Sequence, residues 1–135
     1  MKRLILDTQC LLSVVSGYHQ HKSTSLAAIW AAFRRRELIL VFSEVSLTEI
    51  QRVLDYASVR QLNITSGQAF AAASQLLLLG EYHAPVPTYS WPSLTDEKDW
   101  FLLDLLYHSE ADALISRDKR VLQAGVALGL PIRKP

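Results

Sequence analysis

The chain has 135 residues, half of them hydrophobic and a fifth charged, and its formal net charge is +1. We expect one domain, residues 1–135, whose core needs no disulfides, and the composition excludes a disordered chain. The balanced charge excludes the strong overall field that draws basic proteins to nucleic acids.

The single cysteine and the short apolar runs exclude further classes of protein. Cys10 has no partner for an internal disulfide and cannot build a thiolate metal cluster, so metal ligands must be oxygen or nitrogen. No apolar run reaches the roughly 20 residues of a membrane span, and the N-terminus lacks a signal-peptide pattern. We therefore expect a cytoplasmic protein with no membrane partner.

The first predicted element is a strand over residues 4–6. This continuous apolar run is typical of a strand buried on both faces of a parallel sheet. The run ends at Asp7, and open α/β sheets bind ligands beyond the carboxyl ends of their strands. The alternative is that Asp7 or Thr8 only caps the helix predicted from residue 10.

The next segments are interpreted as structural. A polar loop is expected over residues 17–22, where His19 and His21 are expected to face solvent rather than bind a metal. Residues 23–36 have helical periodicity and place Trp30 in the core. Farther along, residues 63–66 are typical of a turn and cap, and a helix from residue 69 is expected to end at Gly80.

A second strand, residues 38–42, leads into a helix over residues 43–56. In this helix Glu49 shares a stripe with Val45 and Val53, which predicts a carboxylate on an apolar face that needs a partner. The competing interpretation is that Ser46 and Glu49 form a capping box.

Three prolines between residues 81 and 94 predict an extended segment with a short strand near residues 82–84. Tyr89 and Trp91 in this segment are expected to pack against the domain rather than stack on bases.

Three aspartates in or next to the following helix, residues 97–109, have different expected roles. Asp99 heads its apolar stripe and is expected to face inward. Thr95 or Asp96 is expected to cap the helix, and Asp104 lies on another flank that we expect to be solvated.

A third buried strand is predicted over residues 113–116, and Asp118 follows it as Asp7 follows the first strand. A helix to residue 128 and a short strand near residues 131–133 close the chain. Basic residues cluster at 34–36, 117–120 and 133–134, where solvated helix ends are a sufficient explanation.

Two acids thus end strands and two lie early in helices that follow the sheet edge; they are Asp7, Asp118, Glu49 and Asp99. Parallel strands with right-handed crossovers bring all four to one end of the sheet. Crowded carboxylates repel one another unless a hard cation neutralises them, and an all-oxygen set suits Mg²⁺ or Mn²⁺. Such a site predicts phosphodiester hydrolysis by metal-activated water.

The order and spacing of these acids resemble the PIN domain family, and most closely its small prokaryotic members, which include the VapC-type toxins of toxin–antitoxin modules. The segments that carry the likeness are 6–8, 43–54, 96–99 and 111–122. The resemblance implies a three-layer α/β/α fold with a central parallel sheet and a Mg²⁺- or Mn²⁺-dependent ribonuclease acting on RNA. It also implies a homodimer and, for toxin members, a small antitoxin that covers the site.

Carried over by motif, the metal-binding and catalytic acids are Asp7, Glu49, Asp99 and Asp118, with Thr8 and Ser116 in support. Two positions depart from the family pattern. Gln9 stands where the family often has Asn, which lengthens an amide near the site. Trp100 stands where Asn or Asp is common, and a side chain of this size is expected to narrow access.

Three other functions fit parts of the pattern. A PIN-like module that binds RNA or protein without cleavage stays open. An aspartyl-phosphate phosphatase with Asp7 as nucleophile is disfavoured, because Gln9 stands where that chemistry normally has a second acid. A receiver domain is disfavoured because no adjacent acidic pair lies near the first strand.

Overall fold

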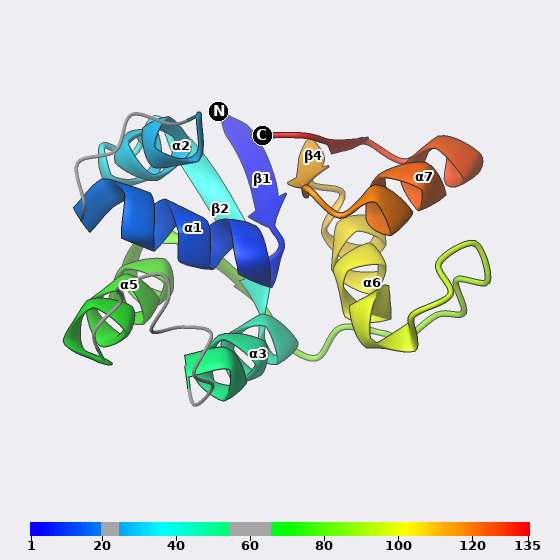
Figure 1. Ribbon diagram of the computed structural model, residues 1–135, viewed down its shortest axis with the longest axis horizontal. Helices are drawn as coiled ribbons and strands as arrows, with labels where there is room; N and C mark the ends of the chain where they lie inside the picture. The colour runs from blue at the N-terminus through cyan, green and yellow to red at the C-terminus, as the bar shows by residue number, and fades with distance from the viewer. Residues whose placement is uncertain (20–24, 55–65) are drawn as a thin grey trace.

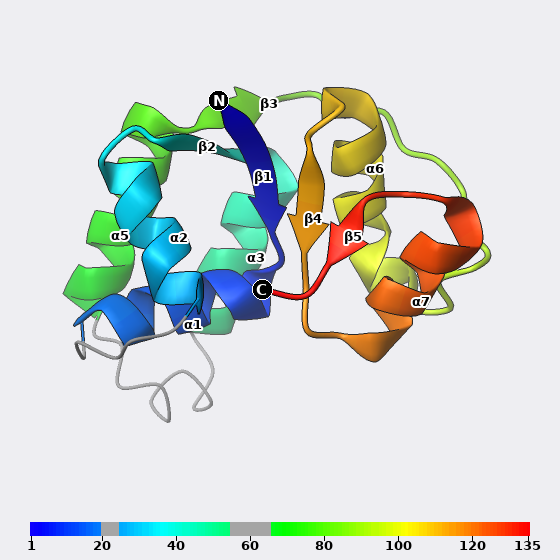
Figure 2. The same ribbon diagram turned by 90° about the horizontal axis from the view of Figure 1, so that it is seen from above.

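Within residues 1–19, 25–54 and 66–135, which the computed structural model describes, five parallel strands form one sheet in the order β3-β2-β1-β4-β5. The first strand of the chain therefore lies at the centre of the sheet (Figure 2). The strands are β1 (Lys2–Leu6), β2 (Leu38–Ser43), β3 (Glu81–His83), β4 (Ala113–Ile115) and β5 (Ile132–Arg133).

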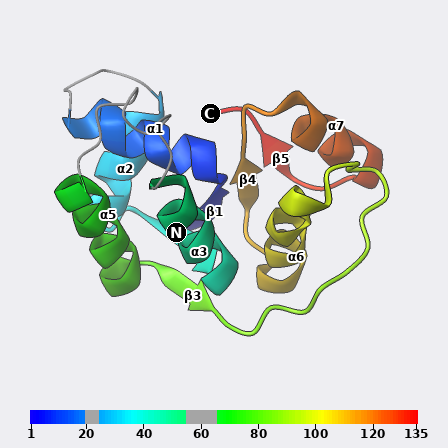
Figure 3. The same cartoon turned by 60° about the horizontal axis from the view of Figure 1, so that its bottom comes forward.

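Helices cover both faces of this sheet, which confirms the predicted three-layer α/β/α fold (Figures 1 and 3). One group consists of α1 (Thr8–His19), α2 (Ser25–Arg34), α3 (Glu44–Leu54) and α5 (Ser66–Leu79). The other face carries α6 (Trp100–Ser109) and α7 (Lys119–Leu128), and the 3₁₀ turn η1 (Glu97–Asp99) precedes α6.

The two cores follow from the pleat of the strands, because successive side chains point to opposite faces. Leu4 and Leu6 pack with α1, α2 and α5, whereas Ile5 between them packs with α6 and α7. Trp30 is buried in the first core, as predicted. Both faces are apolar, which is why the strands appear as unbroken apolar runs in the sequence.

Helix α1 continues through His19, so the loop predicted over residues 17–22 is wrong for residues 17–19. Gly17 disfavours a helix locally, but α1 packs along α2, and this tertiary contact outweighs the weak propensity. His21 and the turn at residues 63–65 lie outside the described residues.

Asp104 is buried, which corrects the expectation that it faces solvent. Its Oδ1 accepts hydrogen bonds from the backbone N–H of Tyr89 at 2.9 Å and from the indole Nε1–H of Trp91 at 2.8 Å. The extended segment before α6 is therefore fastened to that helix by one carboxylate oxygen. The predicted packing of Tyr89 and Trp91 against the domain is confirmed.

A charged pair joins β1 to β3. Arg3 donates through Nε to Glu81 at 3.0 Å and through Nη2 to the other carboxylate oxygen, and His83 contacts that second oxygen at 2.6 Å. The bonds from Arg3, and then those from His83, lower the pKa of Glu81 to about 2 despite partial burial. The ionised form of Glu81 is therefore the one that stabilises the fold.

Glu81→Gln should lower the free energy of unfolding by about 1 kcal/mol at pH 7, because a charge-assisted pair about one-third exposed is lost. The difference between variant and wild type should shrink as pH falls from about 4.5 toward 2, since Glu81 then becomes protonated in the wild type too. Urea unfolding at pH 7 and pH 2.5 measures both values. Glu37→Gln, at an exposed pair with Arg35, is the control and should change little.

No helix in the described part of the chain is long and apolar enough to cross a membrane.

Candidate active site

A pocket of about 470 Å³ opens at the carboxyl edge of the sheet. Strands β1 and β4 end there, and α6 begins there because it runs back along the sheet before β4. The lining residues are Asp7, Thr8, Gln9, Glu49, Arg52, Asp96, Lys98, Asp99, Phe101, Leu102, Arg117, Asp118 and Val121. All four acids that the sequence singles out therefore border one cavity.

Asp7 is nine-tenths buried at the base of this pocket and is held through both carboxylate oxygens. Oδ1 accepts from the backbone N–H of Cys10 at 2.7 Å, and Oδ2 accepts from the hydroxyl of Ser116 at 2.5 Å. Asp7 therefore caps α1, which was the alternative role considered for it from the sequence. It also lies in the pocket. Each carboxylate oxygen has a second lone pair for another ligand.

Ser116 connects the ends of the two central strands. Its buried hydroxyl donates to Asp7 and accepts from the backbone N–H of Asp118 at 3.1 Å. Asp118 in turn caps α7 through a bond from the backbone N–H of Arg120 at 2.8 Å. One hydroxyl thus fixes the spacing of two pocket acids that are far apart in the sequence.

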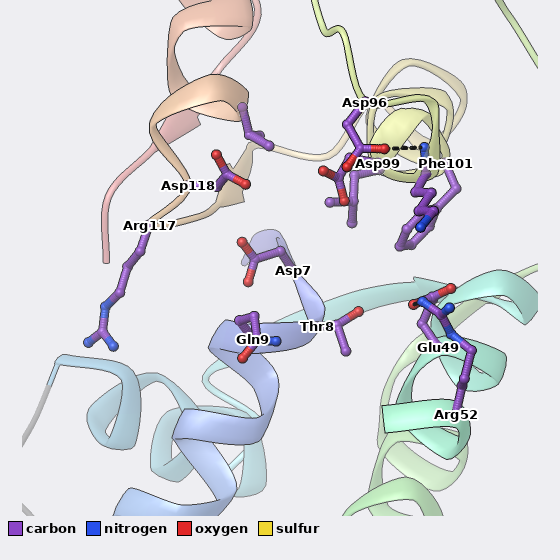
Figure 4. A pocket seen from close by; sticks show the side chains of 13 residues that line it. Asp7, Thr8, Gln9, Glu49, Arg52, Asp96, Asp99, Phe101, Arg117 and Asp118 are labelled. Atoms are coloured by element: carbon purple, nitrogen blue, oxygen red, sulfur yellow. Dashed lines mark hydrogen bonds and ion pairs between the residues drawn. The ribbon is translucent and has the colours of Figure 1, made fainter. Parts of the chain in front are cut away.

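Asp99 stands at the junction of η1 and α6 and makes no side-chain capping bond. Figure 4 shows Asp7, Asp99 and Asp118 around a shared opening. Burial raises the pKa of Asp99 to about 6, and repulsion from nearby carboxylates adds to the effect; these are Asp96, Asp118, Asp7 and Glu49. The pocket therefore carries more negative charge than its surroundings offset.

Glu49 lies at the edge of the same pocket and pairs with Arg52, whose Nη2 donates to Oε2 at 2.7 Å (Figure 4). The alternative interpretation, a capping box of Ser46 with Glu49, does not hold. The box forms one turn earlier, where the hydroxyl of Ser43 accepts from the backbone N–H of Ser46 and the reverse bond is also made. Glu49 is therefore not needed to begin α3.

Three helices begin at the pocket, and Asp7, Asp99 and Asp118 are the residues immediately before α1, α6 and α7. The positive end of a helix dipole favours a nearby carboxylate. This arrangement offsets part of the repulsion among the acids at this sheet edge.

Seven lining residues were not singled out as site residues from the sequence: Arg52, Asp96, Lys98, Phe101, Leu102, Arg117 and Val121. Arg52 has a local signal, because it lies three residues after Glu49 on one helix. Trp100 does not line the pocket, since its indole N–H donates to the carbonyl of Leu94 at 2.7 Å. Phe101 takes the position at the wall that the sequence suggested for Trp100.

The family model of the PIN domain matches residues 3–120. The chain belongs to the PIN domain family. No curated protein matches it. This match confirms the resemblance to the PIN family that was seen in the sequence. Membership of the family indicates nuclease activity in general. PIN domains generally use divalent metal ions.

The candidate ligands in this pocket are carboxylate oxygens, which are the atoms that a divalent cation such as Mg²⁺ prefers. Among the described residues, however, no group of three or more acidic, histidine or cysteine side chains is close enough to enclose a metal. Mg²⁺ is usually bound by one or two carboxylates and keeps several waters. The residues therefore fit a partly hydrated ion better than a fully protein-bound one.

Proposed function

We propose that this PIN domain is a Mg²⁺- or Mn²⁺-dependent endoribonuclease. Asp7, Glu49, Asp99 and Asp118 are its metal-binding and catalytic acids, and Thr8 and Ser116 support them. The observation that carries the proposal is the convergence of these acids on one pocket, where burial, and then repulsion between the acids, raises the pKa of Asp99 to about 6. A cation relieves that repulsion.

The residues of the pocket have different roles. Asp7 is oriented by Ser116 and by Cys10, so it meets an ion in a fixed position without reorganisation. Asp99 has no capping bond to give up. A bound divalent ion would activate water and offset negative charge on the phosphate. Lys98 and Arg117 at the rim provide positive charge for the substrate.

Two isosteric changes, one just before α6 and one within it, test the proposal. Asp99→Asn should reduce Mn²⁺-dependent cleavage of a panel of structured RNAs at least ~10-fold, because a pocket carboxylate is lost. Asp104→Asn is the matched control, since its buried Oδ1 can still accept from Tyr89 and Trp91. It should cleave like the wild type.

Equal residual cleavage by wild type, Asp99→Asn and a double variant with Asp7→Asn would remove the nuclease assignment. Retained RNA binding in that result would favour the second candidate, a PIN-like module that binds without cutting. The lack of three close ligands among the described residues is the observation that keeps this candidate open.

We further propose that the chain is the toxin of a toxin–antitoxin module, that it forms a homodimer and that a small antitoxin covers the pocket. Helix α5 has no charged residue and exposes Phe70, Leu77 and Leu78, which supports a protein–protein contact. Light scattering measures the oligomeric state. A short gene next to the coding frame, whose product suppresses cleavage, would support the toxin assignment, and a monomer without such a gene would remove it.

A further inference from the structure

Two histidines meet where the end of β3 lies beside the last turn of α6. The imidazole rings of His83 and His108 have centroids 5.3 Å apart and planes at 88° to each other. Neither residue lines the acidic pocket, and neither belongs to one of the two apolar cores. The proposed nuclease activity therefore gives this pair no role.

The carboxylate of Glu81 orients the ring of His83, because Nε2 of His83 lies 2.6 Å from Oε2 of Glu81. The pKa of Glu81 is about 2, so at neutral pH this carboxylate only accepts hydrogen bonds. The neutral imidazole of His83 must then carry its proton on Nε2, which leaves the lone pair of Nδ1 for another partner. A carboxylate bonded in this way is the usual support of a histidine that ligates Zn²⁺.

The separation of the two rings is typical of a pair that ligates one ion. With Zn–N bonds of about 2.0–2.1 Å and tetrahedral angles, two imidazoles on the same Zn²⁺ have centroids roughly 5 Å apart. The observed 5.3 Å is close to this value. The side chain of His83 is 22% exposed and His108 is exposed, so an ion reaches the pair from solvent. The exposed ring of His108 can turn about its side-chain bonds to align a nitrogen with the ion.

The charges beside the pair favour a cation. Arg3 donates to Glu81, and this bond is the main reason that the pKa of Arg3 is raised. The carboxylates of Asp112 and Glu110 add to the effect. Three carboxylates therefore act on one guanidinium. In addition, His108 lies in the last turn of α6, where the negative end of the helix dipole favours positive charge.

We propose that His83 and His108 form a Zn²⁺ site that is separate from the acidic pocket. Imidazole nitrogen suits Zn²⁺, whereas Mg²⁺ and Mn²⁺ prefer oxygen, so the two sites select different ions. Within the part of the chain that the structure describes, no third acidic, histidine or cysteine side chain completes a set of three ligands. Water therefore occupies the remaining positions of the ion, and Zn²⁺ binds reversibly and joins the end of β3 to the end of α6.

Calorimetric titration with ZnCl₂ measures this site. Excess Mg²⁺ in the buffer competes for the oxygen ligands of the acidic pocket and not for imidazole. The wild type should bind Zn²⁺, and His83→Gln and His108→Gln should each weaken binding at least ~10-fold. Loss of a group that only supports a metal ligand already costs about 10-fold or more, and each of these changes removes a ligand itself.

The other two histidines of the chain provide the matched control. A double variant, His19→Gln with His21→Gln, also removes imidazoles and should leave Zn²⁺ affinity unchanged. Histidine ring ¹⁵N chemical shifts identify the nitrogens that bind, and we expect a Zn²⁺-dependent change at Nδ1 of His83. Because His108 is exposed, His108→Gln should keep the wild-type thermal midpoint in the absence of Zn²⁺, which separates loss of the site from unfolding.

Wild-type Zn²⁺ affinity in either single variant would overturn the proposal, and so would binding that only the double variant loses. Absence of Zn²⁺ binding by the wild type would overturn it as well. None of these outcomes depends on RNA cleavage. The nuclease is tested by Mn²⁺-dependent cleavage, so the two proposals can fail separately.

Discussion

Asp7→Asn should reduce Mn²⁺-dependent RNA cleavage at least ~100-fold, the largest effect on activity that we expect from any single change. Loss of a group that only supports a metal ligand typically costs about 10- to 100-fold, so loss of a ligand itself should cost at least as much. Asp7 also lies between Asp99 and Asp118 in the pocket. The variant should bind Mn²⁺ more weakly, which the electron paramagnetic resonance signal of free Mn²⁺ measures independently of cleavage.

The fold should survive this change. An asparagine oxygen still accepts from the backbone N–H of Cys10, and its amide can donate to the hydroxyl of Ser116. The thermal midpoint and circular dichroism spectrum of the variant should therefore match those of the wild type. Unchanged Mn²⁺ affinity in a folded variant would remove Asp7 from the set of metal ligands.

Phe33→Ala should lower the free energy of unfolding by about 3–5 kcal/mol, the largest effect on stability that we expect. The Phe33 side chain is 1% exposed and its ring lies 5.3 Å from that of Trp30, between α2 and the sheet. Truncation removes buried apolar surface and leaves a cavity that the surrounding strands cannot fill. A domain of this size has a total stability of about 5–15 kcal/mol, so a large fraction is lost.

Phe70→Ala is the matched control, because the same atoms are removed from a side chain that is 75% exposed. Its free energy of unfolding as a monomer should stay within about 0.5 kcal/mol of wild type. Urea unfolding at low protein concentration compares the two variants directly. Equal destabilisation by both would show that Phe33 does not anchor the first core.

The local pattern of apolar residues was sufficient to predict most of the strands and helices. The unbroken apolar runs at residues 4–6, 38–42 and 113–116 predict β1, β2 and β4 because each strand is buried on both faces. The acids that follow these runs were predicted for the same reason, since a strand end is visible in the sequence. Asp7 and Asp118 line the pocket as expected.

The errors arose where a long-range contact outweighs local preference. Asp104 appeared to lie on a polar flank of its helix, but the extended segment with Tyr89 and Trp91 covers it. Helix α1 continues past the point where Gly17 suggests a stop, because α2 packs along it. Glu49 fitted a capping box by spacing, and the actual box uses Ser43, whose position depends on where β2 ends.

By itself the sequence determined the kind of sheet, because buried strands are visible as local apolar runs, and the order of its acidic segments determined the family. Only the tertiary structure decided that one hydroxyl, Ser116, joins Asp7 to Asp118. It also decided that the rings of His83 and His108 lie in contact. These pairings depend on the register of β1 against β4 and on where the end of α6 meets β3, which no local pattern encodes.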